Sequence, residues 1–145
     1  MARYIVDSQI DNHEKYYFIR EQESQDIVLL PSKYLMHKKR SKLSPNTIRR
    51  SAGAISYYLN YIDETGIQLD DVWEMPYDKQ QEHFTDYLIW LQAGLHSGDS
   101  YKKKPYNETC NAYLKDVFRF FCFLELEADM ERLKVLYYDS FTTHD

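Results

Sequence analysis

The chain has 145 residues, of which 43% are apolar and 16% aromatic, and its net charge is −5. This length fits one domain, and with only four Gly and four Pro the composition excludes collagen-like and loop-rich chains. No apolar run approaches the ~20 residues that span a bilayer, and the first residues lack the apolar core of a signal peptide. We therefore expect a soluble, cytoplasmic protein that does not engage a membrane. The 14 tyrosines predict a thin core with many boundary positions, because a tyrosine ring can pack while its hydroxyl stays wet.

Charge is strongly segregated along the chain. Every charged residue from Ile27 to Ile62 is basic, whereas Lys79 is the one basic residue from Asp63 to Asp99. The segment from Ser100 to Arg119 is again mostly basic. Because an electrostatic field depends on where charges sit, two basic blocks can form a positive surface on an acidic protein.

The first 31 residues differ from the rest of the chain. Two β-branched and aromatic runs, Tyr16–Ile19 and Ile27–Leu30, flank the polar stretch Glu21–Asp26. This pattern predicts a short β-hairpin made of these two runs. We expect residues 1–31 to form an N-terminal extension.

Four helices are expected beyond Pro31, which should end the strand pattern. The second has the clearest limits, because Ser44 is a good N-cap, Pro45 suits the first helical position and Gly66 suits the C-cap. Asn107 is expected to cap the fourth. The predicted ranges are Tyr34–Lys39, Pro45–Glu64, Lys79–Ala93 and Asn107–Leu126, with loops at Ile67–Asp78 and Gly94–Tyr106.

The two long helices have one apolar face and one polar face each. At about 100° per residue, the polar face of the fourth helix carries Asn111, Lys115 and Arg119. The polar face of the second helix includes Gly53, which would allow a backbone to approach closely. The other residues on that face are Asn46, Arg50, Tyr57 and Asn60.

The starts of these two helices carry a recognisable pattern. Ser44–Ile48 opens the second helix and Asn107–Asn111 opens the fourth, about 60 residues later. Each is a polar cap followed by small hydrogen-bonding residues and then apolar residues; the second series ends in Phe120, Phe121 and Leu124. Over roughly residues 32–126 the chain resembles the core-binding domain of tyrosine recombinases, the phage-integrase family.

This resemblance implies a mainly α fold, a four-helix SAM-like bundle that closes over one face of a DNA duplex. In the family a second domain closes over the other face and carries the catalytic Arg, Lys, His and Tyr residues. We expect this chain to lack that set, with residues 127–145 leading toward it. The expected function is therefore duplex DNA binding in integration and recombination, without cleavage by this fragment. Expected partners are double-stranded DNA and other recombinase protomers.

The chain departs from the family pattern at two places. Ser51 stands where the second helix usually has an aromatic residue, and Ala112 and Tyr113 stand where the fourth often has Arg after Asn. Basic character falls instead on Lys115 and Arg119.

The residue types around both helix starts suit phosphate binding. Lys and Arg, hydroxyl and amide side chains, and helix N-termini are the groups that contact DNA phosphates. The candidate DNA contacts are Lys38, Lys39, Arg40, Lys42, Ser44, Asn46, Thr47, Arg49, Arg50, Tyr57, Lys102, Lys103, Lys104, Asn107, Thr109, Asn111, Lys115 and Arg119.

Each group also has a plainer interpretation. Ser44 and Asn107 are helix caps, Lys38–Arg40 suits a helix end that favours cations, and Lys102–Lys104 can be a solvated loop. Arg49 and Arg50 can belong to a solvated helix face.

Two other functions compete with DNA binding. The acidic total and the aromatic density also suit a helical protein-interaction module. A small enzyme or metal protein has little support, because the acidic cluster Asp70, Asp71 and Glu74 lacks a metal-binding loop and the histidines show no ligand spacing. We expect no catalytic residue, no metal and no cofactor here. Cys110 and Cys122 are too far apart along one helix to form a disulfide, and we expect free thiols.

Overall fold

The computed structural model describes residues 3–97 and 104–127. It is mostly helical, as predicted, with one small antiparallel sheet. In chain order the elements are β1 (Tyr4–Asp11), β2 (Glu14–Glu21), α1 (Leu29–Arg40), α2 (Pro45–Thr65), α3 (Leu69–Glu74), α4 (Tyr77–Gln92) and α5 (Asn107–Glu127).

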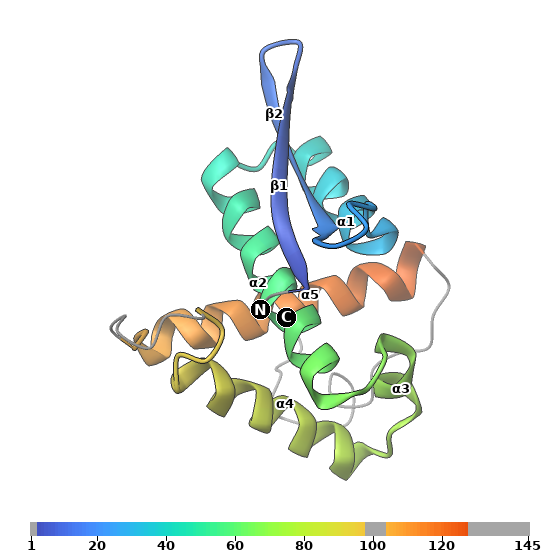
Figure 1. Ribbon diagram of the computed structural model, residues 1–145, viewed down its shortest axis with the longest axis vertical. Coiled ribbons are helices and arrows are strands. Elements are labelled where there is room, and N and C mark those ends of the chain that lie inside the picture. Colours follow the sequence, from blue (N-terminus) through green and yellow to red (C-terminus); the bar gives the residue numbers. More distant parts are fainter. Residues whose placement is uncertain (1–2, 98–103, 128–145) are drawn as a thin grey trace.

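The two long helices, α2 and α5, cross near the middle of the molecule (Figure 1). The β1–β2 hairpin extends beyond the helices at the end where α2 begins, and α3 and α4 lie at the opposite end (Figure 1). Within residues 3–97 and 104–127, no helix is both long and apolar enough to cross a bilayer.

Helix α2 begins and ends where its sequence predicts. The Ser44 hydroxyl accepts a hydrogen bond from the backbone N–H of Thr47 at 3.2 Å, and Pro45 is the first helical residue. Gly66 adopts the left-handed conformation at the C-cap, with φ of 78°, which glycine reaches without a steric penalty. The capping roles predicted for Ser44 and Gly66 are therefore confirmed.

The hairpin exists, but its predicted strand pairing is wrong. The run Tyr16–Ile19 pairs with the segment that precedes it, and Val6 lies opposite Ile19. The connecting residues Asn12 and His13 have φ of 49° and 66°. Positive φ at both turn positions gives the type I′ turn, whose twist matches that of the strands. Asn12 was the available sequence signal, because asparagine tolerates this conformation well.

The run predicted as the second strand, Ile27–Leu30, instead leads into α1. Ile27 forms one isolated bridge to Arg20, and Leu29 is already helical. Pro31 does not interrupt the chain here, because it falls in the first turn of the helix, where its missing N–H has no helical partner to lose.

A fifth helix, α3, lies in the segment predicted as a loop. The side chain of Asp71 accepts a hydrogen bond from the backbone N–H of Gln68 at 2.8 Å. A side chain in the first turn of α3 therefore binds the backbone of the N-cap residue. Val72 and Trp73 are buried on its inner side. The apolar run was too short to reveal helical periodicity in the sequence.

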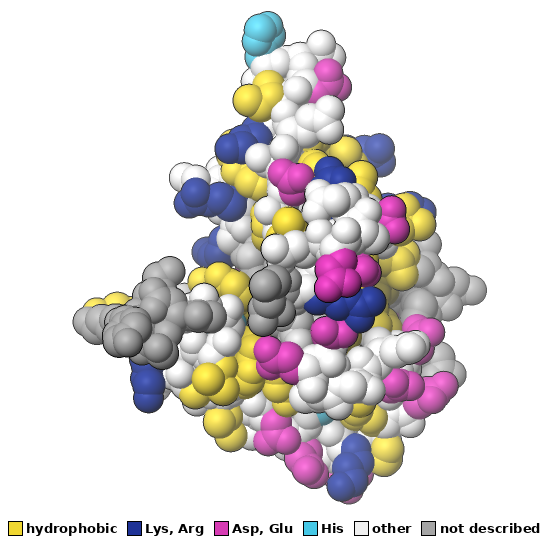
Figure 2. All heavy atoms as spheres, in the orientation of Figure 1, with side chains coloured by type: hydrophobic (Ala, Val, Ile, Leu, Met, Phe, Trp, Pro, Cys, Tyr) yellow, Lys and Arg dark blue, Asp and Glu magenta, His cyan; other side chains and the backbone are white. Residues whose placement is uncertain are grey.

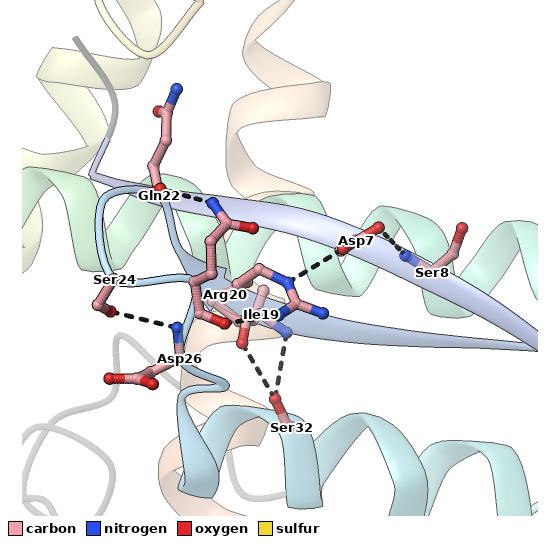
Figure 3. Close-up of polar contacts among 9 residues, drawn as sticks. Asp7, Ser8, Ile19, Arg20, Gln22, Ser24, Asp26 and Ser32 are labelled. Atoms are coloured by element: carbon pink, nitrogen blue, oxygen red, sulfur yellow. Dashed lines mark hydrogen bonds and ion pairs between the residues drawn. The ribbon is translucent and has the colours of Figure 1, made fainter.

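The hairpin is fixed to the helices by hydrogen bonds at its base. The Ser32 hydroxyl of α1 lies 3.1 Å from the backbone nitrogen of Ile19, and Arg20 reaches across the strands to Asp7 (Figure 3). On the other strand, Asn60 of α2 accepts from the backbone N–H of Tyr4 at 2.8 Å and donates to its carbonyl at 3.1 Å. Asn60, predicted on the free polar face of its helix, is therefore used to hold β1.

Aromatic side chains fill the core between α2, α4 and α5. Tyr58 is fully buried, and its ring centroid lies 5.1 Å from that of Tyr87 and 5.8 Å from that of Phe121. Its hydroxyl lies 2.8 Å from Nε2 of His83, which satisfies a polar group that burial would otherwise leave without a partner. The expectation that tyrosines occupy the boundary of a thin core is thus wrong for Tyr58 and Tyr87, both of which are fully buried.

His83 makes the stability of this core depend on pH. Burial lowers the pKa of His83 from 6.5 to about 4, because a charged imidazolium is poorly solvated there. The unfolded chain takes up a proton at this residue below about pH 6.5, whereas the folded chain resists it. The free energy of unfolding should therefore fall by on the order of 1–2 kcal/mol between pH 7 and pH 5 through this residue. Thermal unfolding at the two pH values measures the fall.

Two variants test the assignment to His83. In His83→Gln the loss of stability between pH 7 and pH 5 should shrink. Phe84→Leu, in the neighbouring core position, should lower stability at both pH values yet keep the wild-type pH dependence. An undiminished pH dependence in His83→Gln would show that other groups cause it.

Candidate nucleic-acid interface

A hollow of about 490 Å³ separates the hairpin from the N-terminal half of α2. Helix α2 forms one wall, with Asn46, Arg50, Gly53 and Tyr57 of its predicted polar face and also Arg49. Tyr113 of α5 closes one end. The hairpin forms the other wall through Val6, Asp7, Ser8 and Tyr17. Groups from four elements, β1, β2, α2 and α5, therefore surround one concave, cation-bearing surface.

Aromatic rings lie on the α5 side of this hollow. The Tyr57 ring meets that of Tyr113 edge to face, with centroids 5.4 Å apart, and that of His96 with centroids 4.7 Å apart. Burial raises the pKa of Tyr113, so its hydroxyl stays protonated near neutral pH. These rings give the hollow a rigid side, because packed rings have few rotamers to change.

Beside the hollow, one buried carboxylate joins α2 to α5. Asp116 of α5 is 1% exposed, and its Oδ2 lies 3.6 Å from Nε of Arg50 on α2. Its Oδ1 lies 3.3 Å from Nη1 of Arg119 and accepts a hydrogen bond from the Ser51 hydroxyl at 3.2 Å. This contact gives the buried hydroxyl of Ser51 a hydrogen-bond acceptor.

Lys38 is withdrawn from the surface. It is 8% exposed, and its Nζ lies 5.2 Å from the centre of the Tyr34 ring. Burial lowers the pKa of Lys38, and the charge of Asp116 opposes this effect. Its burial argues against the predicted direct DNA contact, because the ammonium is largely shielded from solvent.

Three further basic candidates lie on the other side of the hairpin. Lys39 and Arg40 of α1, and Lys42 just after it, line a second hollow, of about 940 Å³, between β2 and α1. Lys39 is already engaged, since its Nζ lies 3.9 Å from the Glu14 carboxylate and 5.3 Å from the Tyr16 ring centre. The basic block that is continuous in sequence is therefore divided in space.

The last turn of α1 contains a His-x-x-Arg spacing, from His37 to Arg40. The His37 ring packs against Phe123 of α5 with centroids 5.2 Å apart, and Arg40 is exposed. These two residues form a helix end packed on a neighbouring helix, and we assign them no catalytic role.

The two helix starts differ in how their polar groups are used. The Ser44 and Thr47 hydroxyls lie 2.8 Å apart and hydrogen-bond to each other. Asn107 is the first helical residue of α5, and the N–H of Cys110 donates to the carbonyl of Tyr106. The cap position thus falls on Tyr106 and not, as predicted, on Asn107.

The other candidates on the second basic block are mostly at the surface. Lys104, Asn107, Asn111, Lys115 and Arg119 are exposed, and Thr109 is half-buried. Lys102 and Lys103 lie outside the described residues. Cys110 and Cys122 are free thiols, as predicted, the first buried and the second half-buried.

Two exposed cations, one on α2 and one on α5, remain outside these ion pairs. Arg49 and Lys115 form no ion pair with any residue in the described ranges. Figure 2 shows several Lys and Arg side chains along the edge formed by the N-terminal half of α2, and acidic side chains over α3, α4 and the end of α2 as well as on the hairpin.

Sequence reasoning missed three contributors to this surface. Asp116 is not among the residues singled out from the sequence, although its spacing of three from Arg119 is that of an ion pair on a helix. Tyr113 is named there only as a departure from the resembled pattern. The hairpin wall could not be anticipated, because the first strand was not recognised.

Within residues 3–97 and 104–127, no group of three or more His, Cys, Asp or Glu side chains could hold a metal ion. No family model matches the chain, and neither a curated protein nor a solved structure matches it significantly.

Proposed function

We propose that this chain binds duplex DNA through the surface formed by α2 and α5, as the core-binding domain of a tyrosine recombinase. The observation that carries the proposal is the meeting of two predicted cations, Arg50 and Arg119, at one buried carboxylate, Asp116. The two arginines are 69 positions apart in the sequence, yet both contact the same carboxylate.

The chemistry of that face suits a phosphate backbone. Arg49, Arg50, Arg119 and Lys115 supply charge, and the amide of Asn46 supplies a neutral donor, all at the surface. The N-terminus of α2 lies on the same side and adds the positive end of its dipole. The acidic residues of α3 and α4 would be repelled by DNA, so the charge distribution favours one docking orientation.

In this proposal the chain grips the duplex and a second domain, with the catalytic Arg, His and Tyr residues, cleaves it. Other protomers of the recombinase would occupy the same DNA. The proposal assigns no cofactor and no metal to the chain.

A protein-interaction module is the second candidate. It is favoured by the exposed apolar side chains of Ile89 on α4 and Leu95 in the following loop, which are 56% and 61% exposed. A gel-shift titration with unrelated and palindromic duplexes at low salt separates the two functions. If no duplex is shifted, the interaction module is the better proposal.

Substitution of Arg49 or Lys115 tests the proposed interface. Arg49→Ala and Lys115→Ala should each weaken duplex binding severalfold and reduce the slope of log affinity against log salt by about 1, because each removes one phosphate contact and the counterion release linked to it. Neither change removes an ion pair from the folded chain, so thermal stability should be unaffected. Fluorescence anisotropy at several salt concentrations measures the slopes.

Lys79→Ala is the matched control for these variants. Lys79 is 62% exposed on α4 and pairs with Glu82, among the acidic residues and away from the proposed interface. Its loss should leave both affinity and slope as in the wild type. Equal effects of Lys79→Ala and Lys115→Ala would indicate that only total charge matters and would remove α5 from the interface.

Gly53, in the wall of the hollow, provides a further test. An added Cβ at this position would have Tyr57 Cε2 as its nearest neighbour, at 4.0 Å, so the fold has room for it. Gly53→Ala should therefore raise the free energy of unfolding by about 0.5–1 kcal/mol, the usual gain from replacing glycine inside a helix. Duplex affinity should fall if a DNA backbone approaches here. A more stable variant with unchanged affinity would place the DNA elsewhere.

A further inference from the structure

Asp116 is an unusual group to find at a proposed DNA-binding surface, because its carboxylate would repel phosphate. It is nevertheless 1% exposed, so solvent and any ligand meet the two arginines that cover it first. Both arginines are about half exposed, with side-chain fractions of 50% for Arg50 and 58% for Arg119. The carboxylate therefore lies behind a pair of guanidinium groups.

Most of the hydrogen-bonding capacity of these guanidinium groups remains unused. Each arginine has five N–H donors in a fixed plane. Asp116 engages Nε of Arg50 and Nη1 of Arg119. The remaining donors are available to an acceptor from solvent, and planar arginine forks match phosphate oxygens well.

The carboxylate itself is incompletely satisfied. Its Oδ2 is buried and has no hydrogen-bond partner among the described residues, since the 3.6 Å approach of Arg50 is an ion pair and too long for a hydrogen bond. Such a group lowers stability. The Oδ2 side of Asp116 therefore stabilises the fold less than a fully hydrogen-bonded carboxylate would.

We propose that Asp116 is a positioning residue that holds Arg50 of α2 and Arg119 of α5 together as one clamp for a single phosphate of the DNA backbone. This inference rests on the proposed function and assigns one contact within it. Two neighbouring guanidinium groups repel each other, and the shared carboxylate removes that repulsion and fixes both. The three groups together keep a net charge of +1, and Lys38 lies close enough for the charges of Asp116 and both arginines to act on its pKa.

This clamp and simple electrostatics make opposite predictions for Asp116→Asn. The change removes one negative charge from the chain, and by charge alone it should strengthen DNA binding. If Asp116 positions the arginines, the amide cannot hold both, and duplex affinity should fall about tenfold, as for the loss of a charged hydrogen bond. Asp86→Asn, at an exposed position on α4, makes the same change in charge away from the clamp and should not weaken binding.

A second variant keeps the proposal testable if Asp116→Asn fails to fold, which circular dichroism shows. Arg119→Lys keeps the charge and can still pair with Asp116, but it loses the planar fork. Its duplex affinity should fall severalfold, whereas Arg3→Lys, the same change at a residue that pairs with Asp63 outside the proposed interface, should bind as the wild type does.

The outcomes separate this inference from the proposed function. If Arg49→Ala weakens binding while Asp116→Asn binds as tightly as Asp86→Asn, the surface binds DNA but the clamp is wrong. Wild-type affinity in Arg119→Lys likewise overturns the clamp. If the wild-type chain binds no duplex at low salt, the proposed function fails and the clamp fails with it.

Discussion

The crossing of α2 over α5 is the constraint on which the rest of this structure depends. On one side of the crossing, aromatic packing around Tyr58 and Phe121 closes the core. On the other side, Ser51 and Arg50 meet Asp116. The apolar side makes the crossing stable, because buried aromatic surface dominates core energetics. The polar side restricts how the helices can rotate, because an unpaired buried carboxylate would be strongly unfavourable. The same contact thus supports both the fold and the proposed binding face.

Local chemistry explains why parts of this fold were predictable. Helix α2 has a serine cap, a proline in the first turn and a glycine at its end, so both limits were found to within one residue. The stripe of apolar residues along α5 was long enough to show its period. The complete burial of Tyr58 was not predictable in this way, because it depends on a partner, His83, that another helix supplies.

The parts that were missed depend on contacts between distant segments. The pairing of Val6 with Ile19 is set by a turn at Asn12 and His13, and neither residue is the glycine that usually marks such turns. The link from Arg50 to Asp116 crosses between helices, so no spacing within one helix encodes it. The same limit applies to Lys38, whose burial follows from the packing of α1 on α5 and not from its own basic neighbours.

The acidic net charge of −5 is compatible with the proposed DNA binding because the acids of α3 and α4 lie at the end of the molecule opposite the start of α2. At physiological salt the Debye length is about 8 Å, so a phosphate near Arg49 is influenced mainly by the charges beside it and little by the acids of α3 and α4. The distant acids act earlier, during approach, when they disfavour encounters in the wrong orientation. In this proposal the acidic end of the molecule restricts the orientation in which the chain meets DNA. The proposed clamp at Asp116 then acts at close range, where screening is weak.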